Sequence, residues 1–297
     1  MTANIIPPRV KMDRPPVPVR LLALDVDGTI LNPQSRLEKT VQEAIGRVVE
    51  AGIKVVLCTG RRFRRARAIA EMLCLDSPMV TNSGALVKCP LSNATHWCAA
   101  HSVDDFQTIV KVFQVHERPI MSFQDSSADE PDFVTSAYPS GCDLFDQYLA
   151  ENLAFGRVEA DWFENPDSHS GHFHLCAAGD RDQMQNIADQ LNFRYPGRFQ
   201  IFVQKSPAYV AWMCEVLRCD ASKWTALKTL ADSWQIDSHS ICAVGDDAND
   251  IPMIEQAGWG VAMGHAEEFV HEKASWSCLP NSENGLIQVI DRVLQSL

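Results

Sequence analysis

Acidic side chains at two places in the chain have the types and spacing required for phosphoryl transfer. Asp25 and Asp27 stand two residues apart at the end of the apolar run Leu21–Val26. A carboxylate at a strand end can attack phosphorus and form an aspartyl-phosphate, while a second carboxylate two residues on can give and take the proton. Asp246 ends a second apolar run, in the segment Gly245–Asp250.

A metal ion and a phosphoryl group could both be held by these residues and two others. Asp25 and Asp246 offer hard oxygen ligands that suit Mg²⁺, which would offset their repulsion and screen an incoming dianion. Thr59, Lys223 and the backbone N–H groups after Asp25 could bind the phosphoryl oxygens. Taken singly, an Asp-x-Asp is more often a turn or cap, and a lone threonine or lysine an N-cap or a surface residue. The order along the chain of the two acidic segments, Thr59 and Lys223 together favours a phosphoryl-transfer site.

Short apolar runs alternate with stretches of helical periodicity on both sides of these clusters. Strands this apolar must be covered on both faces, which predicts an α/β fold with a Rossmann-like, doubly wound parallel sheet. Ligands bind at the carboxyl ends of such strands, so the four clusters should converge in one crevice. The expected elements are strand Leu21–Val26, helix Leu37–Glu50, strand Ile53–Cys58, then a helix from Ser222 to about Trp234, strand Ser240–Val244, helix Ile251–Gln256, strands Gly258–Met263 and Ser275–Leu279, and helix Gly285–Leu297.

The middle of the chain does not keep this rhythm. A structureless loop of that length is improbable, so we expect residues 88–213 to form an inserted α+β cap over the carboxyl edge of the sheet. The catalytic core would then comprise residues 20–87 and 214–297, with hinges near Gly84 and Cys214, after a proline-rich tail over residues 1–19. The cap should contain helices Val103–His116 and Arg181–Asn192, and strands His172–Ala177, Phe199–Val203 and Tyr209–Glu215.

Composition excludes several classes of protein and partner. The 297 residues suffice for about two domains, and the longest apolar runs are far too short to span a bilayer. A net charge of −12 opposes binding to nucleic acid but leaves a small phosphorylated metabolite possible. The ten cysteines contain no C-x-x-C pair, and no export signal precedes the fold. We therefore expect reduced cysteines and a cytoplasmic enzyme.

The order of the motifs resembles the haloacid dehalogenase-like superfamily, and within it the Cof-type (class IIB) phosphatases, whose α/β cap lies between the second and third motifs. The resemblance covers nearly all of residues 20–297. It is carried by Asp25-Val26-Asp27-Gly28-Thr29-Ile30, Thr59-Gly60-Arg61, Lys223, Gly245-Asp246-Asp247-Ala248-Asn249-Asp250-Ile251-Pro252-Met253, Val261-Ala262-Met263-Gly264 and Glu283-Asn284-Gly285.

The resemblance implies a role for each motif residue. Asp25 would be the nucleophile, and Asp27 the general acid/base and, through its carbonyl, a metal contact. Asp246 would be a further Mg²⁺ ligand, and Asn249 and Asp250 would support the metal and Lys223. Thr59, Gly60 and Arg61 form the second motif. True dehalogenases lack the second aspartate of the first motif, so the resemblance implies a phosphatase that acts on a sugar phosphate or similar metabolite.

Two departures from the family pattern leave the substrate open. The third motif reads Ala221-Ser222-Lys223-Trp224, without the frequent glycine beside the lysine, and His265 replaces a common asparagine after Met-Gly. A phosphomannomutase-like phosphomutase shares this core and cap and remains the alternative enzyme. A non-catalytic module that binds a phosphometabolite is a weaker alternative, because Asp25 and Asp27 are both present. The oligomeric state and the cap residues that select the substrate are not predicted.

Two further clusters allow more than one interpretation. Five arginines between Arg61 and Arg67 open an expected helix, where they either form a solvated face paired with acids or attract an anionic substrate. His169, His172 and His174 could bind a transition metal, but no cysteine or carboxylate spacing accompanies them, which disfavours a metal site. No P-loop and no strand-borne Gly-x-Gly-x-x-Gly is present, so nucleotide-dependent kinases and nicotinamide enzymes have no support.

Overall fold

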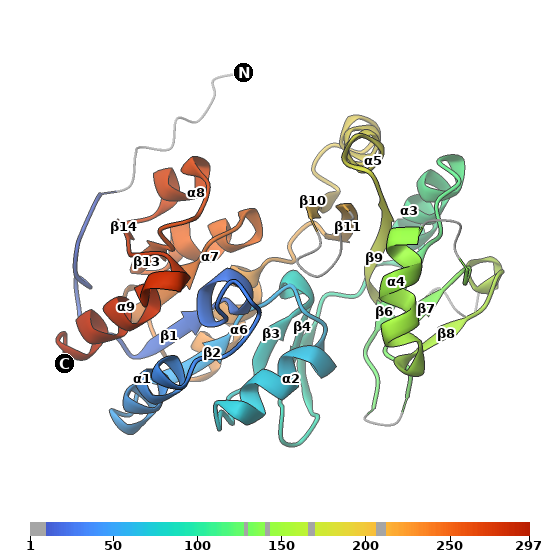
Figure 1. The fold of residues 1–297 in the computed structure, drawn as a ribbon. Coiled ribbons are helices and arrows are strands. Elements are labelled where there is room, and N and C mark those ends of the chain that lie inside the picture. Colours follow the sequence, from blue (N-terminus) through green and yellow to red (C-terminus); the bar gives the residue numbers. More distant parts are fainter. Residues whose placement is uncertain (1–9, 128–129, 140–142, 166–169, 206–211) are drawn as a thin grey trace. The chain divides into compact units, whose positions relative to one another are not determined.

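The apolar runs of the sequence form a parallel sheet in the computed structural model, which describes residues 10–127, 130–139, 143–165, 170–205 and 212–297 (Figure 1). Its five strands have the order β14-β13-β12-β1-β2, and all neighbours are parallel. Every residue of β1, which lies between β12 and β2, is buried, as expected for a strand covered on both faces. The strands are β1 (Leu21–Leu24), β2 (Lys54–Leu57), β12 (Ile241–Gly245), β13 (Trp259–Ala262) and β14 (Trp276–Ser277).

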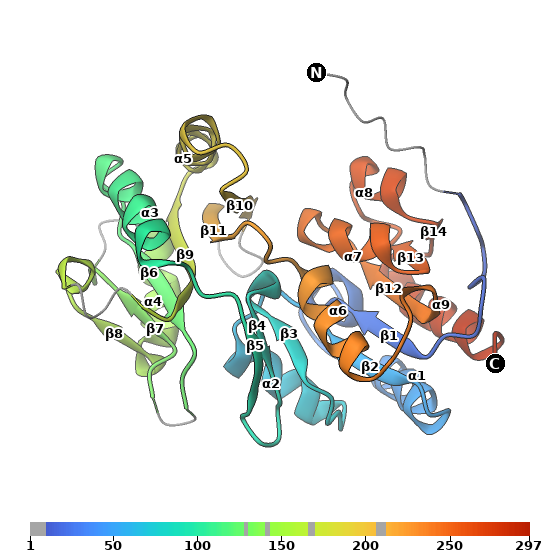
Figure 2. The ribbon, with the colours of Figure 1, turned by 180° about the vertical axis from the view of Figure 1, so that it is seen from behind.

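Helices cover both faces of this sheet, which confirms the predicted doubly wound α/β fold. The first and last helices pack together on one face, while α6 and α7 pack together on the other (Figures 1 and 2). The amphipathic helix α1 places Val41, Ala44, Ile45 and Val48 against the core. The helices are α1 (Lys39–Glu50), α2 (Phe63–Met72), α6 (Lys223–Ser233), α7 (Ile251–Gln256), α8 (Glu268–Lys273) and α9 (Gly285–Leu294).

A three-stranded antiparallel sheet, which the periodicity did not predict, follows α2. It comprises β3 (Met79–Thr81), β4 (Leu86–Lys88) and β5 (Thr95–Cys98). Asn93, at φ 59°, closes the turn between the last two strands, where the Cys89 amide donates to the Ala94 carbonyl at 2.9 Å. The predicted start of the insert, residue 88, is therefore the last residue of β4 in this three-stranded sheet. The second compact unit begins at residue 97.

The second unit spans residues 97–221 and mixes helices with an antiparallel-rich sheet, an α+β composition. Its sheet has the order β10-β11-β9-β6-β7-β8. Strand β11 pairs with β9 as far as Leu217, so the unit ends at residue 221 rather than at 213. The elements are α3 (Val103–Val115), β6 (Met121–Gln124), β7 (Phe133–Thr135), α4 (Asp143–Asn152), β8 (Gly156–Val158), β9 (His172–Gly179), α5 (Arg181–Arg194), β10 (Phe199–Lys205) and β11 (Trp212–Arg218).

Part of the expected N-terminal tail is bound to the first unit. The Lys11 amine donates to the carbonyls of His271 and Ala274 at 2.7 and 3.0 Å, at the end of α8. The indole N–H of Trp259 donates to the Met12 carbonyl at 2.9 Å. Residues 1–9 lie outside the described part of the chain. The segment from residue 11 is thus held at the edge of the sheet.

Most of the described cysteines, and two of the three histidines considered as possible metal ligands, are buried. The nine described cysteines are free, and five of them are buried. His172 is buried on β9, where Nδ1 lies 2.9 Å from the Ser122 hydroxyl. His174, on the same strand, is also buried, whereas His169 lies outside the described residues.

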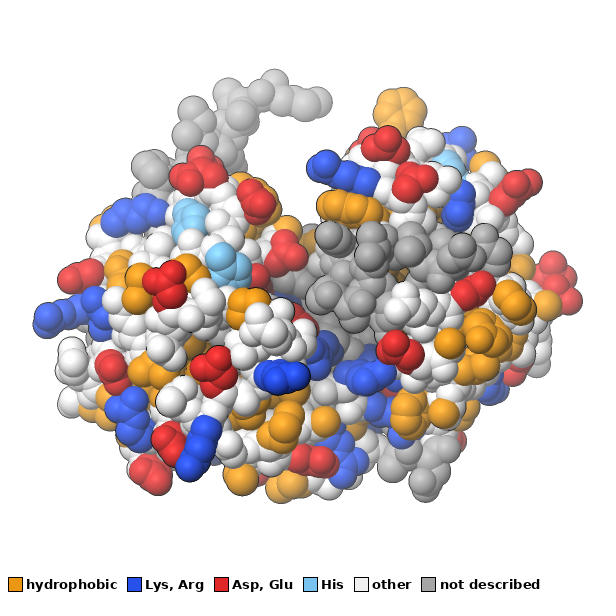
Figure 3. Space-filling view, in the orientation of Figure 1, with side chains coloured by type: hydrophobic (Ala, Val, Ile, Leu, Met, Phe, Trp, Pro, Cys, Tyr) orange, Lys and Arg blue, Asp and Glu red, His pale blue; other side chains and the backbone are white. Residues whose placement is uncertain are grey.

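Charged side chains of both signs are interspersed over the face drawn in Figure 3. Within the described part of the chain, no helix is long and apolar enough to cross a membrane.

Candidate active site

The first acidic motif lies in the turn Val26–Ile30, directly after β1. Asp25 is buried, and its backbone N–H donates to the Val244 carbonyl of the adjacent strand at 3.0 Å. Gly28 turns the chain with φ at 81°, a conformation that side chains disfavour. The turn therefore holds Asp25 at the carboxyl end of the sheet, beside β12.

Lys223 reaches this carboxylate from the first turn of α6. The Ser222 hydroxyl caps the helix by accepting the Thr225 N–H at 3.0 Å. Lys223 Nζ then donates to Asp25 Oδ1 at 2.7 Å and to Asp250 Oδ1 at 2.5 Å. The lysine side chain is only 1% exposed. The three residues form one buried group in which a single cation contacts two carboxyl groups.

The charges of this group shift one another's pKa values. Burial raises the pKa of Asp25 well above its usual range, opposed by the charge of Lys223. Burial by itself would lower the pKa of Lys223, but the carboxylates of Asp25 and Asp250 raise it overall. The lysine is therefore a permanent cation beside the candidate nucleophile.

Asp250 organises the loop that follows β12. Its Oδ2 accepts the backbone N–H groups of Asp246 and Asp247 at 3.0 and 3.1 Å. A Cβ on Gly245 would come within 2.3 Å of the Asp250 carboxyl carbon, so only glycine allows this approach. Both carboxylate oxygens of Asp250 thus accept hydrogen bonds from other groups of the protein.

The second motif contributes Thr59, Gly60 and Arg61 after β2. The Thr59 hydroxyl is buried and accepts the Arg61 N–H at 3.1 Å. The Arg61 guanidinium donates from Nε and Nη2 to the two oxygens of Asp27 at 2.7 and 2.6 Å. Burial acts to lower the pKa of Arg61, but its bonds to Asp27 raise it overall.

Two further residues complete the surroundings: Ser83, which the sequence did not single out, and Gly84, which it gave only as a hinge. Ser83 Oγ lies 3.5 Å from the amide nitrogen of Asn249. Gly84, at φ 99°, lies so close to α6 that a Cβ would meet the backbone of Ser222 at 2.1 Å. The run Asn82-Ser83-Gly84, with turn-forming residues directly after a strand, was the only signal for them. His265, which replaces the asparagine common in the family pattern, has its Nε2 3.3 Å from Asp246 Oδ2.

A sequence model of haloacid dehalogenase-like hydrolases matches residues 22–290, which includes every residue of this site. The chain belongs to that hydrolase family. The resemblance of its motifs to the family is thereby confirmed, as are the fold and the enzyme class expected from them.

Several relatives of this hydrolase are named as phosphatases. The chain is 28% identical to 5-amino-6-(5-phospho-D-ribitylamino)uracil phosphatase YwtE of Bacillus subtilis, over 93% of this chain and 98% of the relative. It is 24% identical to the pyridoxal phosphate phosphatase YbhA of Escherichia coli, over 91% and 97%. A solved subclass IIB sugar phosphatase superposes with a TM-score of 0.74 at 17% identity, covering 94% and 100%. The fold and the phosphatase class thus agree.

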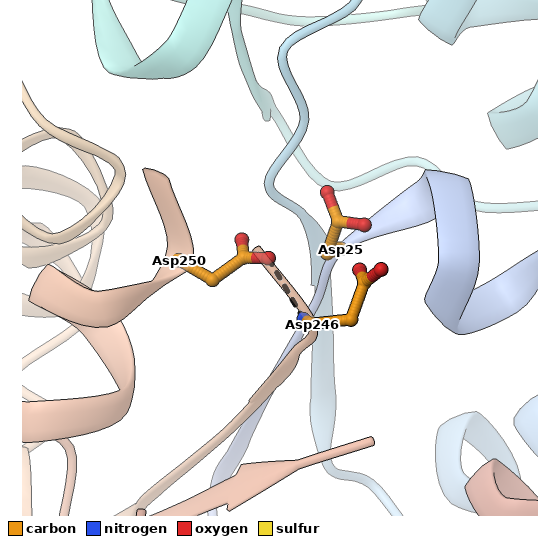
Figure 4. Close-up of side chains that lie close together, drawn as sticks. All are labelled: Asp25, Asp246 and Asp250. Atoms are coloured by element: carbon orange, nitrogen blue, oxygen red, sulfur yellow. Dashed lines mark hydrogen bonds between the residues drawn. The ribbon is translucent and has the colours of Figure 1, made fainter. Parts of the chain in front are cut away.

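A divalent metal ion, which hydrolases of this family generally use, fits the acidic residues. Carboxylate oxygens of Asp25, Asp246 and Asp250 lie within 4.8 Å of one another (Figure 4). Among the residues that the structure describes, Asp246 Oδ1 is buried without a hydrogen-bond partner, and a cation would satisfy it. Because Asp250 already accepts from Lys223 and the loop amides, Asp25 and Asp246 are the better ligands. Their hard oxygens suit a cation such as Mg²⁺ or Mn²⁺.

Proposed function

We propose that this hydrolase is a Mg²⁺-dependent phosphatase that removes phosphate from a small phosphorylated metabolite through an aspartyl-phosphate on Asp25. The observation that carries the proposal is the environment of Asp25. Lys223 holds one of its oxygens at 2.7 Å, and the unpartnered Oδ1 of Asp246 lies beside it. A nucleophilic carboxylate, a fixed cation and a vacant ligand oxygen meet the needs of phosphoryl transfer.

In the first half-reaction, a carboxylate oxygen of Asp25 attacks phosphorus while the bond to the leaving oxygen breaks. Asp27 gives its proton to that oxygen, so the alcohol leaves neutral. Lys223 keeps Asp25 oriented and compensates its charge. Mg²⁺ held by Asp25, Asp246 and the Asp27 carbonyl would supply positive charge to the phosphoryl oxygens.

In the second half-reaction, a water molecule attacks the phosphorus of the aspartyl-phosphate. Asp27, now ionised, takes a proton from this water as the bond to Asp25 breaks. Inorganic phosphate leaves, and both aspartates return to their starting protonation states. Thr59 and the N–H groups of the turn after Asp25 would bind phosphoryl oxygens in both steps.

The substrate is proposed by class. YwtE and YbhA are named for different phosphorylated metabolites, although each aligns with almost the whole chain. This supports a shared phosphoryl site with selection elsewhere, and we assign selection to residues 97–221, which contribute none of the residues above. We therefore expect a sugar phosphate or a similar small phosphorylated metabolite as substrate.

A comparison of two variants, Asp25→Asn and Asp27→Asn, tests the proposal. Asp25→Asn removes the nucleophile and should abolish turnover of every phosphate ester. Asp27→Asn should slow alkyl phosphate hydrolysis by about 10²–10⁴-fold, the usual contribution of proton transfer. Nitrophenyl phosphate has a leaving group that needs no proton, so Asp27→Asn should give a burst of nitrophenol stoichiometric with enzyme. Mass spectrometry should then find one phosphoryl group on the peptide that contains Asp25.

Three results would contradict this assignment. They are a phosphoryl label on another residue, full turnover by Asp25→Asn, and wild-type hydrolysis of alkyl phosphates by Asp27→Asn. Transfer of the phosphoryl group to a sugar, with dependence on a sugar bisphosphate, would identify a phosphomutase instead.

A further inference from the structure

The ion pair between Arg61 and Asp27 occupies both carboxylate oxygens of the proposed general acid/base. Two parallel N–H···O bonds of 2.7 and 2.6 Å join the groups, and each side chain is 26% exposed. Such bidentate pairs are strong and have a fixed orientation. Asp27 is therefore held by the protein in this structure and does not extend freely into the site.

The backbone of Arg61 is anchored, so the pair is not a chance contact of two long side chains. Its N–H donates to the Thr59 hydroxyl at 3.1 Å, and its carbonyl accepts the Asn82 N–H at 3.0 Å. Only the side chain beyond Cα is left to reorient. Because the backbone is fixed, the guanidinium can exchange one anion for another at nearly the same place.

Catalysis requires this pair to open. A general acid or base must come within about 2.6–3.2 Å of the atom that receives or gives the proton. Asp27 cannot act as the acid while both of its oxygens accept from Arg61, because a carboxylate in such a pair carries no proton. Once Asp27 leaves, the partly buried guanidinium needs another anion, because an unpaired charge in such a place is costly.

The phosphate group of the substrate is the anion that arrives at this moment. Arg61 presents a planar donor fork that matches phosphate oxygens as well as it matches a carboxylate. Lys223 cannot take this part, because it is buried and bound to both Asp25 and Asp250. The site thus contains one fixed cation and one cation whose partner can change.

We propose that Arg61 is an exchangeable phosphate-binding residue, which holds Asp27 in the free enzyme and transfers to the phosphate group when substrate binds. The inference rests on the proposed function, and it assigns Arg61 a role in positioning both the substrate and Asp27. Arrival of the substrate then frees the Asp27 carboxylate, which takes up a proton from solvent or from a phosphate monoanion before it gives one to the leaving oxygen.

Binding of inorganic phosphate, measured by calorimetry in the presence of Mg²⁺, tests the exchange in four proteins: wild type, Arg61→Gln, Asp27→Asn and the double variant. Arg61→Gln should weaken phosphate binding about 10- to 100-fold, the loss expected for hydrogen bonds to a charged group. Asp27→Asn should strengthen it, because Arg61 no longer has to be taken from a carboxylate. In the double variant that gain should vanish.

The double variant separates exchange from simple charge removal. If Asp27→Asn strengthens phosphate binding equally with and without Arg61, the gain comes from the lost negative charge alone and the proposal is wrong. It is also wrong if Arg61→Gln leaves phosphate affinity unchanged. Arg67→Gln is the matched control, since Arg67 pairs with Glu71 at 2.8 Å on the exposed side of α2, and it should bind phosphate like wild type.

A kinetic measurement distinguishes this proposal from the proposed function. With a phosphate ester as substrate, Arg61→Gln should raise KM more than it lowers kcat, and Arg61→Lys should restore part of the loss. If the phosphate affinities of the four proteins follow the expected pattern but no aspartyl-phosphate forms, only the catalytic proposal is refuted. If turnover through the aspartyl-phosphate is normal but the effects of Arg61→Gln and Asp27→Asn on phosphate affinity are additive, only the exchange is refuted.

Discussion

Oδ2 of Asp246 lies where a side chain on residue 28 would begin, since a Cβ built on Gly28 would come within 2.2 Å of it. Gly28 also has φ at 81°, in the region that favours glycine. The turn after β1 and the loop after β12 therefore meet at a point where only a glycine leaves room for the acidic side chain. The geometry of the proposed metal site depends on this contact.

Substitution of Gly28 by alanine should displace the Asp246 carboxylate and abolish both Mg²⁺ binding and activity. Gly52→Ala is the matched control, because Gly52 has φ at 80° but no described residue places an atom within 4 Å of its Cβ position. Both variants should lose about 1–2 kcal/mol of unfolding free energy from backbone strain. Urea unfolding and Mg²⁺ calorimetry measure the two effects. Retention of Mg²⁺ binding by Gly28→Ala would show that Asp246 is not held there for a metal.

Removal of the buried lysine should be severe. Lys223→Ala leaves the carboxylates of Asp25 and Asp250 buried without their cation, which should cost about 3–5 kcal/mol of unfolding free energy. Lys228→Ala, on the same helix, breaks an exposed pair with Asp232 and should cost less than about 1 kcal/mol. Urea unfolding followed by tryptophan fluorescence compares them. Equal losses would mean that Lys223 contributes no more than a surface charge.

Chelation should remove activity, and added Mg²⁺ should restore it. Mg²⁺ at one hundred times its dissociation constant should also stabilise the protein by about 2.7 kcal/mol, because it binds only the folded site. Asp246→Asn should lose this stabilisation, whereas Asp291→Asn, in an exposed pair with Arg47, should keep it. Thermal unfolding with and without Mg²⁺ gives the answer. Full activity in excess EDTA would overturn the metal assignment.

The stability of the second unit should fall in acid because of a buried histidine. Burial lowers the pKa of His101 to about 4, while its Nε2 lies 3.3 Å from the Val216 carbonyl. The unfolded chain, with a histidine pKa of about 6.5, then binds more protons than the folded chain between these values. The stability that neutral His101 contributes is complete above pH 6.5. It should be lost by about 1.4 kcal/mol per pH unit as the pH falls toward 4.

The measurement is urea unfolding at several pH values for wild type and His101→Gln. The difference in unfolding free energy between the two should shrink as the pH falls from 7 to 4.5, since only the wild type loses this contribution. A difference that stays constant would mean that His101 has the same pKa in both states.

The local sequence was sufficient for the main features of the fold. Runs such as Leu21–Leu24 are so apolar that they must be buried on both faces, and their alternation with amphipathic helices leaves few arrangements other than a doubly wound parallel sheet. The convergence of Asp25, Lys223 and Asp246 followed from the same reasoning, because the carboxyl ends of parallel strands meet at one edge. Their catalytic roles remain predictions.

The limits of the second unit, which depend on how strands pair, were not predicted. The hairpin of β4 and β5 and the pairing of β11 with β9 moved the limits of the second unit to residues 97 and 221. Short strands of mixed polarity do not indicate in the sequence which partner they will join. The role of Gly84 beside the site, beyond the expected hinge, was missed because it comes from contact with the start of α6 and not from the residue type alone.

The sequence by itself determined which chemistry the chain can perform, because the residue types at the strand ends set the available nucleophile, acid, cation and metal ligands. Only the tertiary structure decided how those groups are shared. Asp250, expected beside Lys223, also accepts from loop amides, and Asp27 is bound to Arg61. Hydrogen bonds of this kind depend on positions within a few tenths of an ångström, and such positions arise only when all the strands and loops have packed together.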